Sequence, residues 1–93
     1  MRISNKQREI ITETIRNLDP DASIRLFGSR ALDSGQGGDI DLLVLSDAIS
    51  YRQKLWLRSV LKEKLGNRKI DLIITGKPNS AFVKYAFANS VIV

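Results

Sequence analysis

The sequence contains no cysteine and no histidine. The missing cysteines exclude disulfides, a zinc–thiolate site and a cysteine nucleophile, and they fit a reducing compartment, so we expect a cytoplasmic protein. The missing histidines exclude the usual general base near neutral pH and a serine–histidine–aspartate triad. Any chemistry must therefore use carboxylates, hydroxyls, lysines, arginines and bound metal.

Long apolar runs are also missing. The first ten residues, MRISNKQREI, are polar, and no run approaches the roughly 20 apolar residues that a bilayer requires, so we expect neither a signal peptide nor a membrane span. A chain of 93 residues with 43% hydrophobic and 27% charged content predicts one small globular domain over residues 1–93. The net charge of +5 favours anionic partners, although many basic domains bind no polyanion.

Helical and strand-like segments alternate along the chain, with turn residues between them. This alternation predicts an α/β (α+β) fold, in which helices pack against a small mixed β-sheet in the order αβαβαβα. The expected helices are Ser4 to Leu18, Ser29 to Leu32, Ser50 to Leu65 and Ser80 to Phe87, and the expected strands are Ser23 to Phe27, Asp39 to Leu45 and Lys69 to Thr75.

Two aspartates, Asp39 and Asp41, open the most apolar of these strands. Residues two apart on a strand share a face, so their side chains lie roughly 6–7 Å apart. Near a core the two carboxylates would repel by about 2–3 kcal/mol, and a divalent cation between them relieves that repulsion. Oxygen ligands without histidine or cysteine favour Mg²⁺ or Mn²⁺ over zinc.

A third carboxylate, Asp71, opens the strand KIDLIIT in the same way. If this strand lies beside the strand of Asp39 and Asp41, all three carboxylates come together. They could then hold two metal ions, one on a triphosphate and one on an acceptor hydroxyl. The alternative is an edge-strand aspartate that faces water.

Gly28, Ser29 and Arg30 stand where a strand ends and a helix is expected to begin. Backbone N–H groups at such a junction suit a phosphate. Glycine permits close approach, while serine and arginine add a hydroxyl and a bidentate cation. A plain strand–helix turn would use the same residues.

Together these motifs resemble a known family. The stretch LFGSRALDSGQGGDIDLLVL from Leu26 to Leu45 resembles the signature of the DNA polymerase beta-like nucleotidyltransferases, in which Gly-Ser precedes an aspartate pair on an apolar strand. The resemblance implies that Gly28 and Ser29 contact the triphosphate and that Asp39 and Asp41 ligate both metal ions. It also implies that Asp71 ligates the metal that activates the acceptor and assists its deprotonation.

In its small size the chain most resembles the minimal nucleotidyltransferases, which pair with helical HEPN proteins. This resemblance implies an antitoxin that uses ATP to adenylylate, or at least neutralises, a ribonuclease toxin. The acceptor stays open between a protein hydroxyl and an RNA end, and a second copy of the chain could also present it.

Two other functions remain open. The first is a non-catalytic binding module, for which the apolar C-terminal residues Phe82, Tyr85, Ala86, Phe87, Val91 and Ile92 would supply a partner surface. The second is a nucleic-acid-binding subunit that uses Lys54, Arg58, Lys62, Lys64, Arg68 and Lys69. Core packing and a solvated helix face, respectively, are the simpler explanations of these residues.

Overall fold

The computed structural model describes residues 3–28, 40–77 and 80–93, which form three helices and four strands. In chain order the elements are α1 (Asn5–Leu18), β1 (Ser23–Phe27), β2 (Ile40–Leu45), α2 (Tyr51–Lys64), β3 (Ile70–Thr75), α3 (Ala81–Ala88) and β4 (Val91–Ile92).

Each of the two long helices begins at a capping box. In α1, the Ser4 hydroxyl accepts a hydrogen bond from the Gln7 backbone N–H at 3.1 Å, and the Gln7 side chain accepts one from the Ser4 N–H at 2.8 Å. Ser50 and Gln53 make the same two bonds at the start of α2. These bonds satisfy backbone donors that a helix leaves unpaired at its N-terminus, which explains why both helices start where the sequence predicts.

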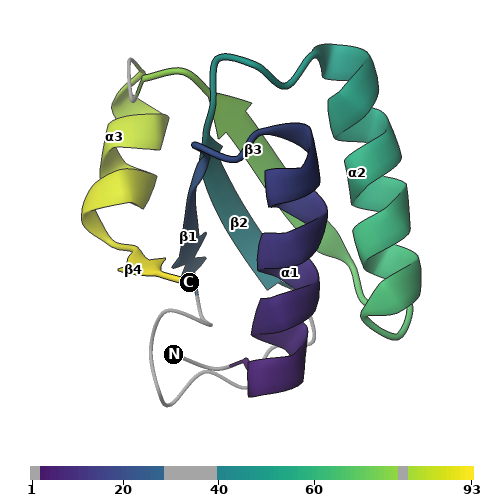
Figure 1. The fold of residues 1–93 in the computed structure, drawn as a ribbon. Coiled ribbons are helices and arrows are strands. Elements are labelled where there is room, and N and C mark those ends of the chain that lie inside the picture. The colour runs from purple at the N-terminus through teal and green to yellow at the C-terminus, as the bar shows by residue number, and fades with distance from the viewer. Residues whose placement is uncertain (1–2, 29–39, 78–79) are drawn as a thin grey trace.

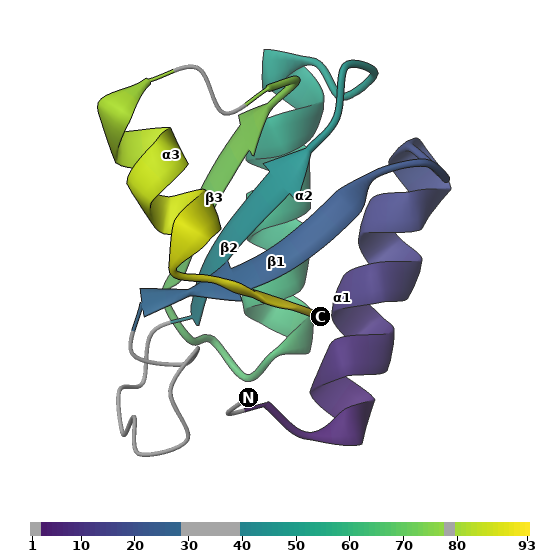
Figure 2. The same ribbon diagram turned by 90° about the vertical axis from the view of Figure 1, so that its left-hand side faces the viewer.

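The strands form one mixed sheet in the order β3-β2-β1-β4. β2 and β3 run parallel, joined through α2, whereas β1 runs antiparallel to both β2 and β4. Figures 1 and 2 show α1 and α2 on one face of the sheet and α3 on the other. β3 is therefore an edge strand within the described residues, with α2 packed beside it.

The core follows from alternation along the strands. Ile24, Leu26 and Leu42 are buried on one face of the sheet, in a cluster with residues such as Ile15 of α1 and Leu61 of α2. Successive strand residues point to opposite faces, so the intervening residues point toward α3. There Leu43 forms a second, smaller cluster with Val83 and Ala86 of α3, against which Phe27, Leu45, Ile73 and Phe87 pack.

The predicted mixed α/β fold is confirmed. One strand is added to the prediction, and one predicted helix lies outside the described residues. The addition is β4, a two-residue strand that pairs Val91 with Leu26 and Ile92 with Arg25 where no strand was predicted. The helix expected from Ser29 to Leu32 lies outside the described residues, as does Asp39. None of the described helices is long and apolar enough to cross a bilayer.

Candidate functional site

Asp41 and Asp71 lie side by side near the N-terminal ends of β2 and β3. They are partners in the parallel register of the two strands. Backbone hydrogen bonds from Ile40 N–H to Lys69 O (3.0 Å) and from Ser46 N–H to Thr75 O (2.9 Å) bracket this ladder and hold the register. The expectation that neighbouring strands bring these two carboxylates together thus agrees with the observed register.

Both carboxylates point to the face of the sheet that carries α3. Asp41 is two residues before Leu43, and Asp71 is two residues before Ile73, and both of these apolar residues pack in the α3 cluster. Each aspartate is partly buried. Strand spacing sets the two residues about 5 Å apart, and at an effective dielectric near 20 two negative charges at that distance repel by about 3 kcal/mol. The pair is therefore suited to bind a cation.

Gly28 lies against Asp41 at the end of β1. Its φ of +73° is in the left-handed region that favours glycine. A Cβ atom added to Gly28 would collide with a carboxylate oxygen of Asp41. Because Phe27 pairs with Asp41 across the antiparallel ladder, the next residue, Gly28, lies against this carboxylate. Glycine at this position leaves room for the Asp41 side chain.

The other predicted site residues, Ser29, Arg30 and Asp39, lie outside the described residues. Within residues 3–28, 40–77 and 80–93, no group of three or more Asp, Glu, His or Cys side chains could hold a metal ion. The three-carboxylate ligand set includes Asp39, so it stays a prediction. Asp41 and Asp71 fit a hard divalent cation in their chemistry, since both offer carboxylate oxygens.

A shallow groove of about 290 Å³ runs along the outer edge of β3 and reaches Asp71. Its α2 wall carries two basic side chains, Lys54 and Arg58, together with Tyr51 and Leu55. The sequence contains the signal for this groove, because Tyr51, Leu55 and Arg58 recur at helical spacing on α2. Their proximity to Asp71 depends on how α2 packs beside β3, which the pattern does not specify.

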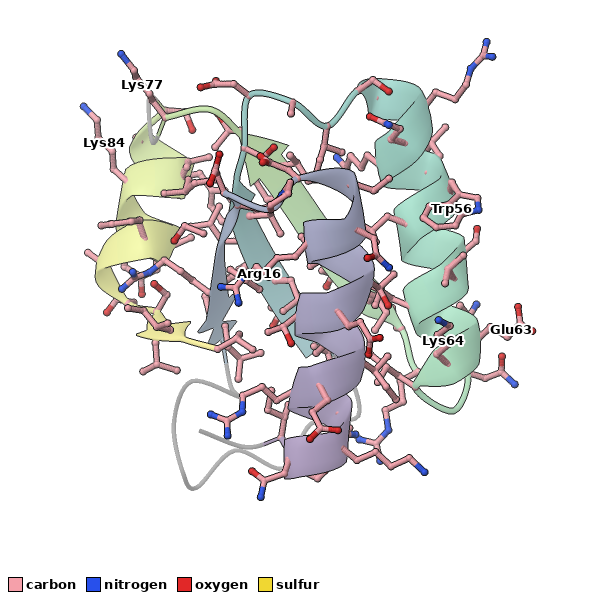
Figure 3. All side chains as sticks on the ribbon, viewed as in Figure 1. Arg16, Trp56, Glu63, Lys64, Lys77 and Lys84 are labelled. Atoms are coloured by element: carbon pink, nitrogen blue, oxygen red, sulfur yellow. The ribbon has the colours of Figure 1, made fainter. Side chains whose placement is uncertain are left out.

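The remaining basic residues proposed for nucleic acid are exposed. Lys62, Lys64, Arg68 and Lys69 all face solvent, and Lys64 and Arg68 line a second shallow groove with Lys6 at the start of α1. Figure 3 shows Lys64 near the C-terminal end of α2. Positive charge thus follows α2 and the turn after it, while the carboxylate pair belongs to the opposite face of the sheet.

The apolar C-terminal residues divide between the core and the surface. Ala86 is buried, whereas Phe82, Tyr85 and Ile92 are exposed. Phe82 meets Phe27 edge-on, with ring centroids 6.4 Å apart and an interplanar angle of 82°. Sequence reasoning missed the nearness of this aromatic pair to Asp41, because it depends on a contact between residues 55 positions apart.

Three comparisons with known proteins bear on this arrangement. A family model described as "nucleotidyltransferase domain" matches residues 8–93. No curated protein sequence matches the chain. Among solved structures, the chain is similar to one in the crystal structure of a mutant toxin–antitoxin complex, MntA-HpeT, with 22% sequence identity and a TM-score of 0.68. That match covers 97% of this chain and 71% of the other, and at this identity it concerns the fold.

Proposed function

The chain belongs to the nucleotidyltransferase domain family, and we propose that it transfers AMP from ATP to a hydroxyl group of a partner. In this proposal it is the antitoxin of a cytoplasmic toxin–antitoxin pair whose other member is a HEPN-type protein. The observation that carries the proposal is the pairing of Asp41 with Asp71 beneath Gly28. The similarity to a chain from a toxin–antitoxin complex supports the biological setting.

The proposed reaction is in-line attack of the acceptor hydroxyl oxygen on the α-phosphorus of ATP. The new bond joins that oxygen to phosphorus, the bond from the α-phosphorus to the bridging oxygen breaks, and pyrophosphate leaves with its electron pair. In this scheme Asp71 takes the proton from the acceptor hydroxyl. Gly28 and Ser29 contact the triphosphate through backbone N–H groups, and Arg30 adds positive charge.

Asp39, Asp41 and Asp71 would hold Mg²⁺ or Mn²⁺, which supplies charge neutralisation of the triphosphate and lowers the pKa of the acceptor hydroxyl. Asp41 and Asp71 fit this role because their charges repel at strand spacing and a cation offsets that repulsion. Lys54 and Arg58, in the groove that reaches Asp71, are suited to hold an acidic or phosphate-bearing part of the acceptor near the same carboxylate.

The transfer itself can be measured directly. Incubation of the protein with the protein encoded beside it, Mg²⁺ and α-labelled ATP should move label onto that partner or onto RNA bound to it. Asp41→Asn and Asp71→Asn should each reduce transfer by at least about 100-fold, the scale of removing a group that stabilises the transition state. Asp47→Asn, an exposed carboxylate just beyond the other end of β2, should transfer at the wild-type rate.

Label that never moves to any acceptor, or that moves equally well with Asp41→Asn and Asp71→Asn, contradicts the proposed reaction. Label on the chain itself would instead identify a second copy as the acceptor.

A second candidate function is neutralisation by binding alone, which the exposed apolar side chains of α2 favour. Tyr51, Leu55 and Trp56 are 72%, 47% and 53% exposed, and Figure 3 shows Trp56 on the outer side of α2. Such a patch beside β3, an edge strand among the described residues, is suited to a protein partner. Under this alternative, Trp56→Glu abolishes neutralisation of the partner, whereas Asp41→Asn combined with Asp71→Asn leaves it intact.

A further inference from the structure

One exposed aromatic ring of α3 contacts Phe27, the strand neighbour of Asp41. Phe82, near the start of α3, leaves 59% of its surface in contact with solvent. It rests edge-on against Phe27, which is itself partly buried in the α3 cluster. A large apolar ring in this position does little for the core, since most of its surface is still in water.

The place of Phe82 relative to the site follows from strand register. Phe27 pairs with Asp41, and Asp41 pairs with Asp71, so the three residues form one row across β1, β2 and β3 on the face that carries α3. Adjacent strands are about 4.8 Å apart. Phe82 meets this row at Phe27, with ring centroids 6.4 Å apart, so the ring contact and one strand spacing put it within about 11 Å of Asp41.

Two described groups on this face, Arg25 and Leu43, are already engaged. Arg25, two residues before Phe27, lies over the Phe87 ring at 4.4 Å and donates a hydrogen bond from Nε to the Ser90 hydroxyl at 2.6 Å. Leu43 is fully buried beneath α3. Phe82 thus keeps an exposed ring in contact with this row at Phe27.

We propose that Phe82, supported by Phe27, is the surface on which the base of the nucleoside triphosphate stacks. This inference rests on the proposed function, because it takes the α-phosphate to lie at Asp41 and Asp71. A nucleotide places its base one ribose away from that phosphate, in reach of a ring that contacts Phe27. The edge-on contact with Phe27 supports the Phe82 ring, while 59% of the residue's surface stays exposed to a ligand.

The chemistry of a phenyl ring defines what it recognises. Every base has a π face, whereas phenylalanine offers no hydrogen bond that would distinguish one base from another. Phe82 should thus contribute affinity for ATP, GTP, CTP and UTP alike. Any preference for adenine must arise from other groups.

The test compares nucleotides with a ligand that has no base. Calorimetric titration in Mg²⁺ measures ATP and inorganic tripolyphosphate binding to the wild type, Phe82→Ala, Phe82→Trp and Trp56→Ala. Trp56 is the matched control, because it is an exposed aromatic on α2 that does not line the groove reaching Asp71. Thermal unfolding of each variant checks that the fold is retained.

We expect Phe82→Ala to weaken ATP binding about tenfold or more, the scale of losing one base–aromatic stack. Its affinity for tripolyphosphate should equal that of the wild type, and Phe82→Trp should restore ATP binding. Trp56→Ala should bind both ligands normally. GTP, CTP and UTP should lose affinity in the same proportion as ATP with Phe82→Ala.

Several results would overturn the inference without touching the proposed function. They are a wild type that binds tripolyphosphate as tightly as ATP, unchanged ATP binding by Phe82→Ala, or an equal loss for both ligands. Unchanged ATP binding together with a weakened partner complex would assign Phe82 to the partner surface. A wild type that binds neither ligand in Mg²⁺ contradicts the proposed function itself.

Discussion

At the residue scale, Gly28 is restricted to glycine by two separate physical effects. Its φ is +73°, and an added Cβ would strike the Asp41 carboxylate. Gly66, in the turn after α2, offers a natural comparison, because its φ is +83° but nothing lies within 4 Å of an added Cβ. The two glycines share a left-handed backbone conformation, and Gly28 alone of this pair also contacts a candidate site residue.

We therefore predict different outcomes for Gly28→Ala and Gly66→Ala. Each should lower the free energy of unfolding by about 1–2 kcal/mol, the cost of a left-handed conformation for alanine. Gly28→Ala should destabilise further and should also reduce nucleotide transfer, because Asp41 must move. Urea denaturation and a transfer assay measure the two effects. Equal transfer by both variants would argue against a role for the Gly28–Asp41 contact.

The negative charge of Asp71 leads to a second prediction at this scale, about the free energy of unfolding. In the absence of divalent metal, Asp71→Asn should raise the free energy of unfolding by on the order of 1 kcal/mol, because it removes the repulsion with Asp41. Adding Mg²⁺ should raise the melting temperature of the wild type more than that of the variant, because a ligand stabilises the state that binds it.

Asp47→Asn serves as the control for this measurement, and its response to Mg²⁺ should match the wild type. A wild type whose melting temperature ignores Mg²⁺ and Mn²⁺ would count against a cation at Asp41 and Asp71.

At the element scale, the N-terminal caps explain where the helices begin and how much the first turn contributes to stability. Ser50 and Gln53 complete a capping box on α2, the helix that forms one wall of the groove beside Asp71. Replacing Ser50 by alanine removes the hydroxyl that accepts the Gln53 N–H. We expect Ser50→Ala to cost about 1 kcal/mol of stability and to leave nucleotide transfer per folded molecule unchanged.

Ser59 is the matched control for this cap. It is an exposed serine within α2, where alanine is the better helix former, so Ser59→Ala should be neutral or slightly stabilising. Thermal unfolding of the two variants separates the cap from a general effect of losing a hydroxyl. A Ser50→Ala protein as stable as Ser59→Ala would contradict the capping argument.

The elements also show what the sequence could predict and what it could not. The helical spacing of apolar residues and the capping residues predicted α1, α2 and α3. The alternation of side chains predicted β1 with the bounds that the structure shows. β4 was not predicted, because two residues carry too little pattern and its existence depends on pairing with β1. For the site, two similar strand starts were enough to suggest that Asp41 and Asp71 meet, whereas the place of Phe82 depends on how α3 packs.

At the scale of the whole molecule, the sheet separates two surfaces. The carboxylate pair belongs to the α3 face. The exposed Tyr51, Leu55 and Trp56 belong to α2 on the other side, next to β3, which is an edge strand in the part of the chain that the structure describes. The prediction of a nucleotidyltransferase is confirmed at the level of family and fold. The Cα radius of gyration is 12.2 Å. A molecule of this size has limited surface for binding both donor and acceptor, so we expect a partner protein to present the acceptor.

The central claim, that Asp41 and Asp71 support transfer of a nucleotide to a partner, is tested most directly by the intact mass of that partner. The partner is purified after co-expression with the wild type, with Asp41→Asn, with Asp71→Asn, or with Asp47→Asn as control. The account predicts a mass increase of one or more AMP groups with the wild type and Asp47→Asn, and none with Asp41→Asn or Asp71→Asn. An unmodified partner that the wild type nevertheless neutralises, or one modified equally by every variant, would contradict it.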